Sequence, residues 1–455
     1  MLLKKRAMEE FNIGIIGSEQ METWVSHCVE MYEGNPSWID IDDNIDSVNF
    51  AKAICSETAR LATLGIGIHV NGPARATWLQ EQLDAIYYRL RHWVEYGCAY
   101  GTVILKPSGK TVSFYTPDRF IVTHETNNAI DGVVFFDTEK MGDKWYTKME
   151  YHRFEGDSYC VTNKCFVGDT ENDLKKDVDI SKTPWAYLVN DVSMENTDKP
   201  VFAVFRTPQA NNIDIDSPFG LPVFSEAVQE LRDLDIAYSR NAKEILNSKR
   251  TVLLDSDSMV SDGQKVSNNA KSLANKREQL GLPDYIKNIR GDGREMFYQE
   301  INPTLQTDMR LNGINALLSQ IGYKVGFSNG HFVFNESRGI QTATQVEADQ
   351  QRTIQFIKDI RDKLEACLNG LLYSLSVFAD LYELAPAGTW EAVFDFGDIT
   401  YNREEDRARW WGYVQSGKVP AWMFFVKFEG MTEEDAKAMV EEASPKQPKL
   451  FGSEE

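Results

Sequence analysis

The chain has 455 residues, a formal net charge of −21 and a pI near 4.8. This acidic balance argues against a DNA-binding protein held by a basic face and against binding to an anionic membrane surface. It does not exclude a protein that DNA merely passes. Apolar residues at 42% and aromatic residues at 11% are typical of a folded chain. The length predicts about two or three packed regions.

The N-terminus and the cysteines indicate the compartment. The segment MLLKKRAMEEF lacks the apolar core of a signal peptide, and no run approaches the ~18 uncharged apolar residues of a membrane span. We therefore expect a protein that is soluble and intracellular when made. The six cysteines are sparse, which predicts reduced thiols. Cys160 and Cys165 lie close together without a second pair, so we interpret them as buried thiols and not as zinc ligands.

The N-terminal part predicts helices followed by a sheet. Apolar residues recur at helical spacing over 19–31, 47–64 and 73–96, with a short strand expected at 65–70. Over 102–167 the period changes to two, and Gly, Asn and Asp turns separate the segments, as in an antiparallel sheet. We therefore expect an α+β fold.

A helix, an insertion and a second helix follow. The first helix is predicted from Pro222 to Leu246, with mixed charges on its outer faces. It is either a surface helix or a helix packed between identical neighbours. The insertion, 249–301, is a polar stretch between two strands. Asn302-Pro303 predicts the start of the second helix, and Gly322 its left-handed end.

The longest predicted helix begins near residue 342. Thr342-x-x-Gln345 and Thr344-x-x-Glu347 spell capping boxes, and apolar residues then recur every three or four positions as far as Leu375. At 1.5 Å per residue this helix is a rod of roughly 50 Å, longer than one core requires. A strand and three shorter helices should follow up to residue 443, the last opened by Thr432-x-x-Asp435.

One segment spells a hydrolase motif. Gly326-Phe327-Ser328-Asn329-Gly330 matches the G-x-S-x-G nucleophile elbow, beside His331. An elbow needs a strand before the serine and a helix directly after it, whereas a helix precedes this segment and a loop follows. The triad histidine should also lie downstream, and His331 is the last histidine of the chain. A serine hydrolase is therefore kept only as an alternative, and we predict that the protein is not an enzyme.

The order of these parts resembles the portal proteins of tailed double-stranded DNA bacteriophages, particularly the long-tailed type of Gram-positive hosts. METWVSHCVEMYEGNPSW is similar to the family's N-terminal Trp…Tyr-x-Gly…Trp region, and ANNIDIDSPFGLPVF resembles the segment that leads into its stem helix. TATQVEADQQRTIQ resembles the Thr-Ala-Thr-Glu-Val start of its long helix. Gln345 replaces the usual glutamate, and Pro222 lies near a common serine. The resemblance spans about residues 21–442, and the order and spacing of the segments carry it.

The resemblance implies a portal-protein fold with an α/β wing, a two-helix stem, a small α/β clip, a long wing helix and a helical crown. The implied parts are the wing at 1–221, a stem helix at 222–248, the clip at 249–301, the second stem helix at 302–323, the tunnel loop at 324–340, the long wing helix and strand at 341–400, the crown at 401–443 and a disordered tail at 444–455.

The resemblance also implies a function and partners. Portal proteins form rings of about twelve subunits in the virion, and of about twelve or thirteen when isolated, at one vertex of the capsid. Double-stranded DNA passes through the ring without sequence-specific binding during packaging and ejection. The implied partners are further copies of the chain, the terminase large subunit, a head-completion adaptor, and major capsid and scaffolding proteins. The implied location is the virion, and the host cytoplasm during assembly. No membrane partner, metal or cofactor is expected.

Two groups of residues are candidate contacts. In the tunnel loop, Ser328, Asn329, His331, Asn335 and Arg338 would touch phosphates weakly, while the acidic wall repels the duplex. The competing interpretation is that this loop only joins two helices and that its phenylalanines hold it against the core.

In the clip, the expected contacts with terminase and adaptor are Arg290, Asp292 and Arg294. A non-portal scaffold protein of the virion is a further alternative. The order helix, insertion, helix, loop, long helix argues against it, because a general scaffold has no reason to show that order.

Overall fold

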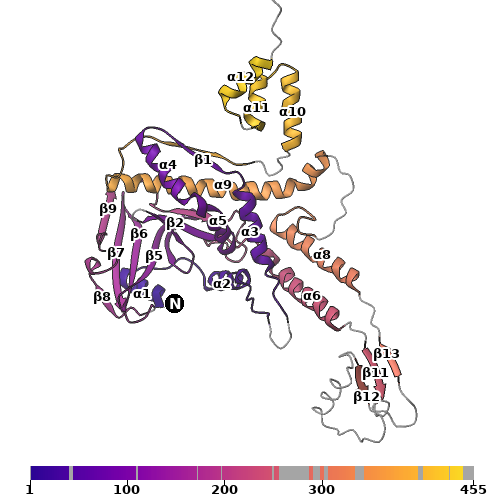
Figure 1. Cartoon of the computed structure of the whole chain (residues 1–455). Coiled ribbons are helices and arrows are strands. Elements are labelled where there is room, and N and C mark those ends of the chain that lie inside the picture. The colour runs from indigo at the N-terminus through magenta and orange to yellow at the C-terminus, as the bar shows by residue number, and fades with distance from the viewer. Residues whose placement is uncertain are drawn as a thin grey trace, which may run out of the picture. The chain divides into compact units, whose positions relative to one another are not determined.

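The structure is a computed structural model that describes residues 2–39, 45–108, 111–171, 173–195, 197–247, 251–255, 286–289, 298–301, 306–333, 343–397, 403–429 and 431–443. Helices and sheets are mixed along the chain, which confirms the predicted α+β class (Figure 1). The chain divides into two compact units, one formed by residues 1–63 and 68–394 and the other by 64–67 and 395–455.

The longest helix, α9 (Ala343–Leu381), confirms the predicted rod and belongs to the first unit. Its apolar stripe packs against α3, α4, β2 and β10 (Figure 1). Gln350–Leu381 is long and apolar enough to cross a membrane by composition, but much of it is buried inside the protein. The stripe consists of the almost fully buried side chains of Ile357, Ile360, Leu364, Leu368, Leu371, Leu372 and Leu375.

The predicted N-terminal helices are present, with two differences, of which the first is an additional helix at residues 2–11 that the apolar spacing did not indicate. Their bounds are α1 (Leu2–Phe11), α2 (Glu19–Glu33), α3 (Phe50–Ala62), α4 (Ala74–Ile86) and α5 (Leu90–Tyr100). The single helix expected over 73–96 is divided by a tighter 3-10 turn, Tyr87–Arg89. Its apolar spacing continues on both sides of this turn, which explains why the sequence indicated one helix. The short strand is β1 (Gly67–Asn71), paired with β14 (Glu391–Asp395).

The strands expected to form one antiparallel sheet belong to two. The larger sheet contains β4 (Phe120–Thr126), β5 (Ala129–Met141), β6 (Lys144–Glu155) and β7 (Ser158–Gly168), with β8 (Lys176–Val178) and β9 (Asp191–Glu195) both paired to β7. The smaller sheet is β10 (Ala203–Arg206), β2 (Thr102–Ser108) and β3 (Thr111–Tyr115), all antiparallel. The distant strand β10 pairs with β2. Because β10 lies outside residues 102–167, the period-two spacing in that range could not predict this pairing.

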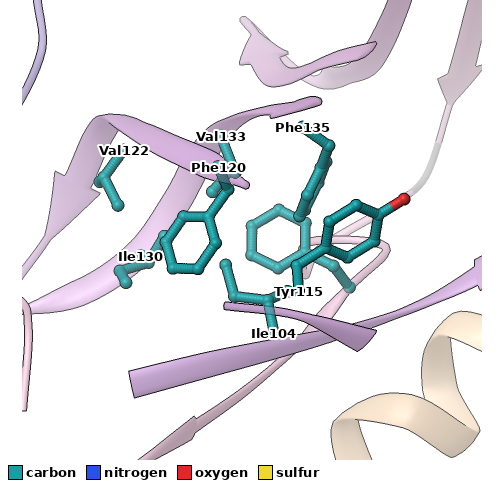
Figure 2. Packing of buried hydrophobic residues seen from close by; sticks show 8 residues of the cluster. Ile104, Tyr115, Phe120, Val122, Ile130, Val133 and Phe135 are labelled. Atoms are coloured by element: carbon teal, nitrogen blue, oxygen red, sulfur yellow. The ribbon is translucent and has the colours of Figure 1, made fainter. Parts of the chain in front are cut away.

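A core of aromatic and branched side chains lies between these two sheets (Figure 2). The Tyr115 and Phe135 ring centroids are 4.7 Å apart, and Phe202 packs edge-on against Phe135. The alternating pattern of each strand places these residues on facing sides. The cluster contains Ile104, Tyr115, Phe120, Val122, Ile130, Val133, Phe135 and Phe202.

The helix–insertion–helix part is present, with shifted ends. A 3-10 turn (Ser225–Ala227) leads into α6 (Val228–Asn247), and the insertion carries β11 (Thr251–Asp255), β12 (Ile286–Ile289) and β13 (Tyr298–Ile301) in the order β12-β11-β13. The second helix, α8, is Thr307–Val325, and the proposed cap Asn302-Pro303 lies outside the described residues.

The prediction that Gly322 ends α8 is wrong. The helix continues for another turn, and Gly326, with φ of 116°, adopts the left-handed conformation. Val325 in that extra turn is only 2% exposed, so the added turn buries apolar surface. Gly322 is buried within the helix, and an added Cβ there would meet Phe332 at 3.4 Å.

The second unit contains α10 (Arg403–Gln415), α11 (Ala421–Glu429) and α12 (Glu433–Ala443). Aromatic contacts join the first two helices, with Trp411 and Phe424 ring centroids 5.0 Å apart. The predicted cap of α12 is confirmed, because the Asp435 amide donates to Thr432 Oγ1 at 3.2 Å. The tail 444–455 lies outside the described residues.

The two neighbouring cysteines lie on opposite faces of β7, because an odd separation in a strand reverses the side chain. Cys165 is buried beside Ile180 and Trp185, whereas Cys160 is only partly buried. Their side chains therefore do not converge on one point.

Candidate functional site

Helices α6 and α8 form an antiparallel pair. Glu230 near the start of α6 lies 2.7 Å from the Lys324 ammonium near the end of α8, and Glu244 near the end of α6 pairs with Arg310 near the start of α8. The side chains of Leu231, Leu234, Ile314, Leu318 and Ile321 are buried. Two ion pairs and an apolar seam therefore hold these helices in one register.

Four large apolar side chains of this pair are exposed. Tyr238 and Ile245 on α6 are each 51% exposed, and Met309 and Tyr323 on α8 are 72% and 59% exposed. Single exposed apolar residues are common, but Tyr238, Ile245 and Met309 together favour contact with a protein partner, whereas the Tyr323 ring is covered by the Arg352 guanidinium at 4.0 Å.

The segment after α8 turns back on an aromatic cluster. Phe327 is fully buried, and its ring lies 4.8 Å from Phe332 and 5.3 Å from Phe356 of α9. Phe332 also meets Phe50 of α3 at 5.1 Å. This part of the predicted tunnel loop is therefore held against the core, as the competing interpretation expected. Phe334 lies outside the described residues.

Ser328 is not available to DNA in this arrangement, which corrects its assignment as a phosphate contact. It is 6% exposed, and its hydroxyl accepts hydrogen bonds from the Thr353 amide at 3.2 Å and the Thr353 hydroxyl at 3.0 Å. The Ser328 amide in turn donates to Thr353 Oγ1 at 2.8 Å. The pair attaches the loop to α9.

His331 and Asn329 lie closer to solvent. The His331 ring, 26% exposed, has Nε2 3.3 Å from Glu57 Oε1 on α3. Hydrogen bonds from Arg60 and then from His331 lower the pKa of Glu57 to about 2. Asn329 is exposed. The other predicted contacts, Asn335, Arg338, Arg290, Asp292 and Arg294, lie outside the described residues.

The nucleophile-elbow alternative does not fit this geometry. A helix precedes Ser328, its hydroxyl is occupied by Thr353, and the His331 side chain is directed to Glu57. A catalytic serine needs an accessible Oγ hydrogen-bonded to a histidine. The described loop provides neither condition.

We expect Ser328→Ala and Thr353→Val each to lower the free energy of unfolding by about 1–2 kcal/mol, because each leaves a buried group without its partner. The double variant should cost about 1 kcal/mol less than the sum, since both changes remove the same bonds. Denaturant unfolding measures all four proteins, and Asn329→Ala serves as the exposed control. Strict additivity would contradict this coupling.

Sequence reasoning missed a buried ionic network between the two sheets. Glu150 of β6 lies 2.6 Å from Lys106 Nζ of β2, 2.7 Å from Lys148 Nζ and 2.8 Å from His152 Nε2. Lys106, Lys148 and His152 are each at most 3% exposed. Lys148, Glu150 and His152 occupy every second position of β6 and therefore lie on one face of the strand. In a sequence, polar residues at this spacing look the same as a strand face that is exposed to solvent. The network is bordered by a cavity of about 70 Å³.

Comparisons with known proteins give limited information. No protein-family model matches the chain, and no curated protein matches it. Among solved structures it is similar to a chain described as "Virion of native gene transfer agent (GTA) particle", at 13% identity over 94% of this chain and 99% of that chain, with a TM-score of 0.42. A TM-score of this size does not establish a common fold.

Proposed function

We propose that the protein is the portal protein of a tailed double-stranded DNA bacteriophage, without catalytic activity of its own. In this proposal copies of the chain form a ring of about twelve subunits at one capsid vertex, and DNA enters and leaves through its centre. The observation that carries the proposal is the paired α6 and α8, which flank a small sheet, expose apolar residues outward and lead into α9.

The exposed apolar surface of the pair supports self-association. Tyr238 and Met309 are 51% and 72% exposed in the single chain. A neighbouring copy that packed against them would bury this apolar surface. Exposed charges of both signs, such as Arg232 and Asp233 on α6, lie on the same helices. In a ring, this surface of each copy would contact a different surface of the next copy. Such a contact is heterologous, and it forms a closed ring when the rotation between copies returns to the first copy.

The charge of the chain supports passage without tight binding. Each copy carries −21, so a ring repels DNA along much of its wall. Asn329 and His331, together with Asn335 and Arg338, would supply the few weak contacts with phosphate. Ser328 would act only by anchoring the loop to α9.

The remaining roles also belong to the proposal. The insertion between α6 and α8 would be the clip, where Arg290, Asp292 and Arg294 meet the terminase large subunit and later a head-completion adaptor. The wing would meet major capsid and scaffolding proteins. The protein would act at the portal vertex of the virion after assembly in the host cytoplasm.

We expect native mass spectrometry and negative-stain images of the purified protein to show rings of about twelve or thirteen subunits with a central hole. Tyr238→Glu with Met309→Glu should convert these rings to monomers, because buried unpaired carboxylates at a contact cost several kcal/mol. Tyr187→Glu with Met141→Glu is the matched control, since both side chains are exposed outside the helix pair. It should leave the rings intact.

A stable dimer without a central hole would contradict the proposal. Rings that survive the α6/α8 substitutions but not the control substitutions would place the subunit contact elsewhere.

A further inference from the structure

A groove of about 470 Å³ lies between α2 and the edge of the larger sheet, away from the helix pair described above. One wall is the α2 stripe Met21, Val25 and Val29, spaced four residues apart. The opposite wall includes Phe120 and Phe219. Met21 and Phe120 are 2% and 1% exposed, so the apolar surface that the groove offers comes from partly exposed side chains such as Val25, Val29 and Phe219, among polar ones.

The β4 edge beside the groove is partly covered by the N-terminal segment, whose Ile15 and Ile16 pack against the core and also line the groove. β4 pairs with β5 along one edge, and on its other edge it makes a single bridge, between Ile16 and Val122, among the residues that the structure describes. The Ile16 amide donates to the Val122 carbonyl at 2.8 Å. Grooves between a helix and a sheet edge are a common way of binding an extended or helical peptide.

The two ends of the groove differ in charge. At one end Glu22 is paired with Lys4 at 2.6 Å. At the other end Glu33 and Asp118 are exposed, and within the described ranges neither has an ion-pair partner. Burial, and then the charges of Asp118 and Glu33, raise the pKa of Tyr100, whose side chain lines the same groove. Glu33 is also the last residue of α2, where the helix dipole adds negative potential.

We propose that this groove binds an amphipathic segment of another protein, with its apolar side chains between α2 and β4 and a Lys or Arg at the Glu33–Asp118 end. The apolar walls account for affinity, and the unpaired carboxylates account for the orientation of the segment. This inference goes beyond the proposed channel and does not depend on ring formation.

The test uses a random 12-residue peptide library displayed on a carrier and selected against the purified full-length protein. Selected peptides should contain apolar residues and at least one Lys or Arg. A fluorescent synthetic copy should bind the wild type, and Glu33→Lys with Asp118→Lys should weaken its binding by about tenfold or more. Val25→Ser with Val29→Ser should weaken it similarly.

The matched control is Glu81→Lys with Asp143→Lys, which changes the net charge equally at exposed sites outside the groove. It should change the affinity less than about twofold, and the thermal midpoint of each variant checks folding. Selected peptides without basic residues, or equal losses in both charge variants, would overturn the proposal. A change in oligomeric state confined to the Glu33/Asp118 variant would assign the groove to a second copy of the chain and overturn it as well.

Discussion

Arg75→Ala is expected to lower the free energy of unfolding by about 3–5 kcal/mol, because it removes a buried cation that satisfies the end of the longest helix. Arg75 on α4 is 1% exposed. Its guanidinium donates to the carbonyls of Ser376, Ala385 and Pro386 at 2.6 to 2.9 Å, and it pairs with Asp380. Without it these acceptors, in the last turns of α9 and in the segment after Leu381, lose their partners, and α4 loses its attachment.

The measurement is guanidinium unfolding followed by circular dichroism, with hydrogen exchange of residues 376–386 as a local readout. Arg75→Lys should recover only part of the loss, since an ammonium cannot match the planar set of donors that reaches several carbonyls. Arg91→Ala on the exposed side of α5 is the control and should stay within about 0.5 kcal/mol of the wild type. A cost below about 1 kcal/mol for Arg75→Ala would show that the chain after α9 finds other partners.

Glu150→Gln should be comparably destabilising, by about 3–5 kcal/mol, because the buried Lys106 and Lys148 would lose their shared carboxylate, although Lys148 would retain Asp137 at 3.2 Å. Glu150 bridges Lys106 and Lys148, whose side chains are 3% and 1% exposed. His152 Nε2 donates to Glu150, and Tyr159 donates to His152 Nδ1 at 2.9 Å, an arrangement that requires a neutral imidazole. The substitution keeps the shape of the side chain, so the loss reports charge rather than packing.

The same network makes stability depend on pH. Burial alone would raise the pKa of Glu150, but Lys106 and Lys148 hold it well below 4.5. The wild type therefore gains stability from this carboxylate above pH 4.5 and loses it as the pH falls toward the depressed folded value. Burial also lowers the pKa of His152 below 6.5. Below pH 6.5 this histidine is therefore protonated more readily in the unfolded chain than in the folded protein, and the folded protein loses further stability as the pH falls.

Unfolding of the wild type and of Glu150→Gln, measured from pH 7 down to pH 3, checks both statements. The difference between the two proteins should shrink below pH 4.5, because acid removes in the wild type the charge that the variant already lacks. Glu139→Gln, at an exposed position of β5, is the control and should follow the wild-type curve. A difference that stays constant with pH would mean that the Glu150 charge contributes little.

Local signals in the sequence were sufficient for most of the longer elements and their type. The apolar stripe of α9, the change of period at residue 102 and the Thr432–Asp435 cap each depend on residues within a few positions of one another. Such signals predicted the α+β class and the order of α6, the small sheet, α8 and α9. They also predicted the hydrolase motif to be accidental, for which the Ser328–Thr353 pair now gives a physical reason.

Only the tertiary structure decided which polar residues are buried and where elements end. Lys148, Glu150 and His152 are interior because β2 and α9, from distant parts of the sequence, cover that side of β6. β2 and β3 pair with each other and with the distant β10, and not with β4, which begins the larger sheet. Helix α8 continues to Val325 because that side chain is buried there. Period and spacing reveal that a segment has two faces, but the free energy that buries one of them comes from whichever distant element packs against it.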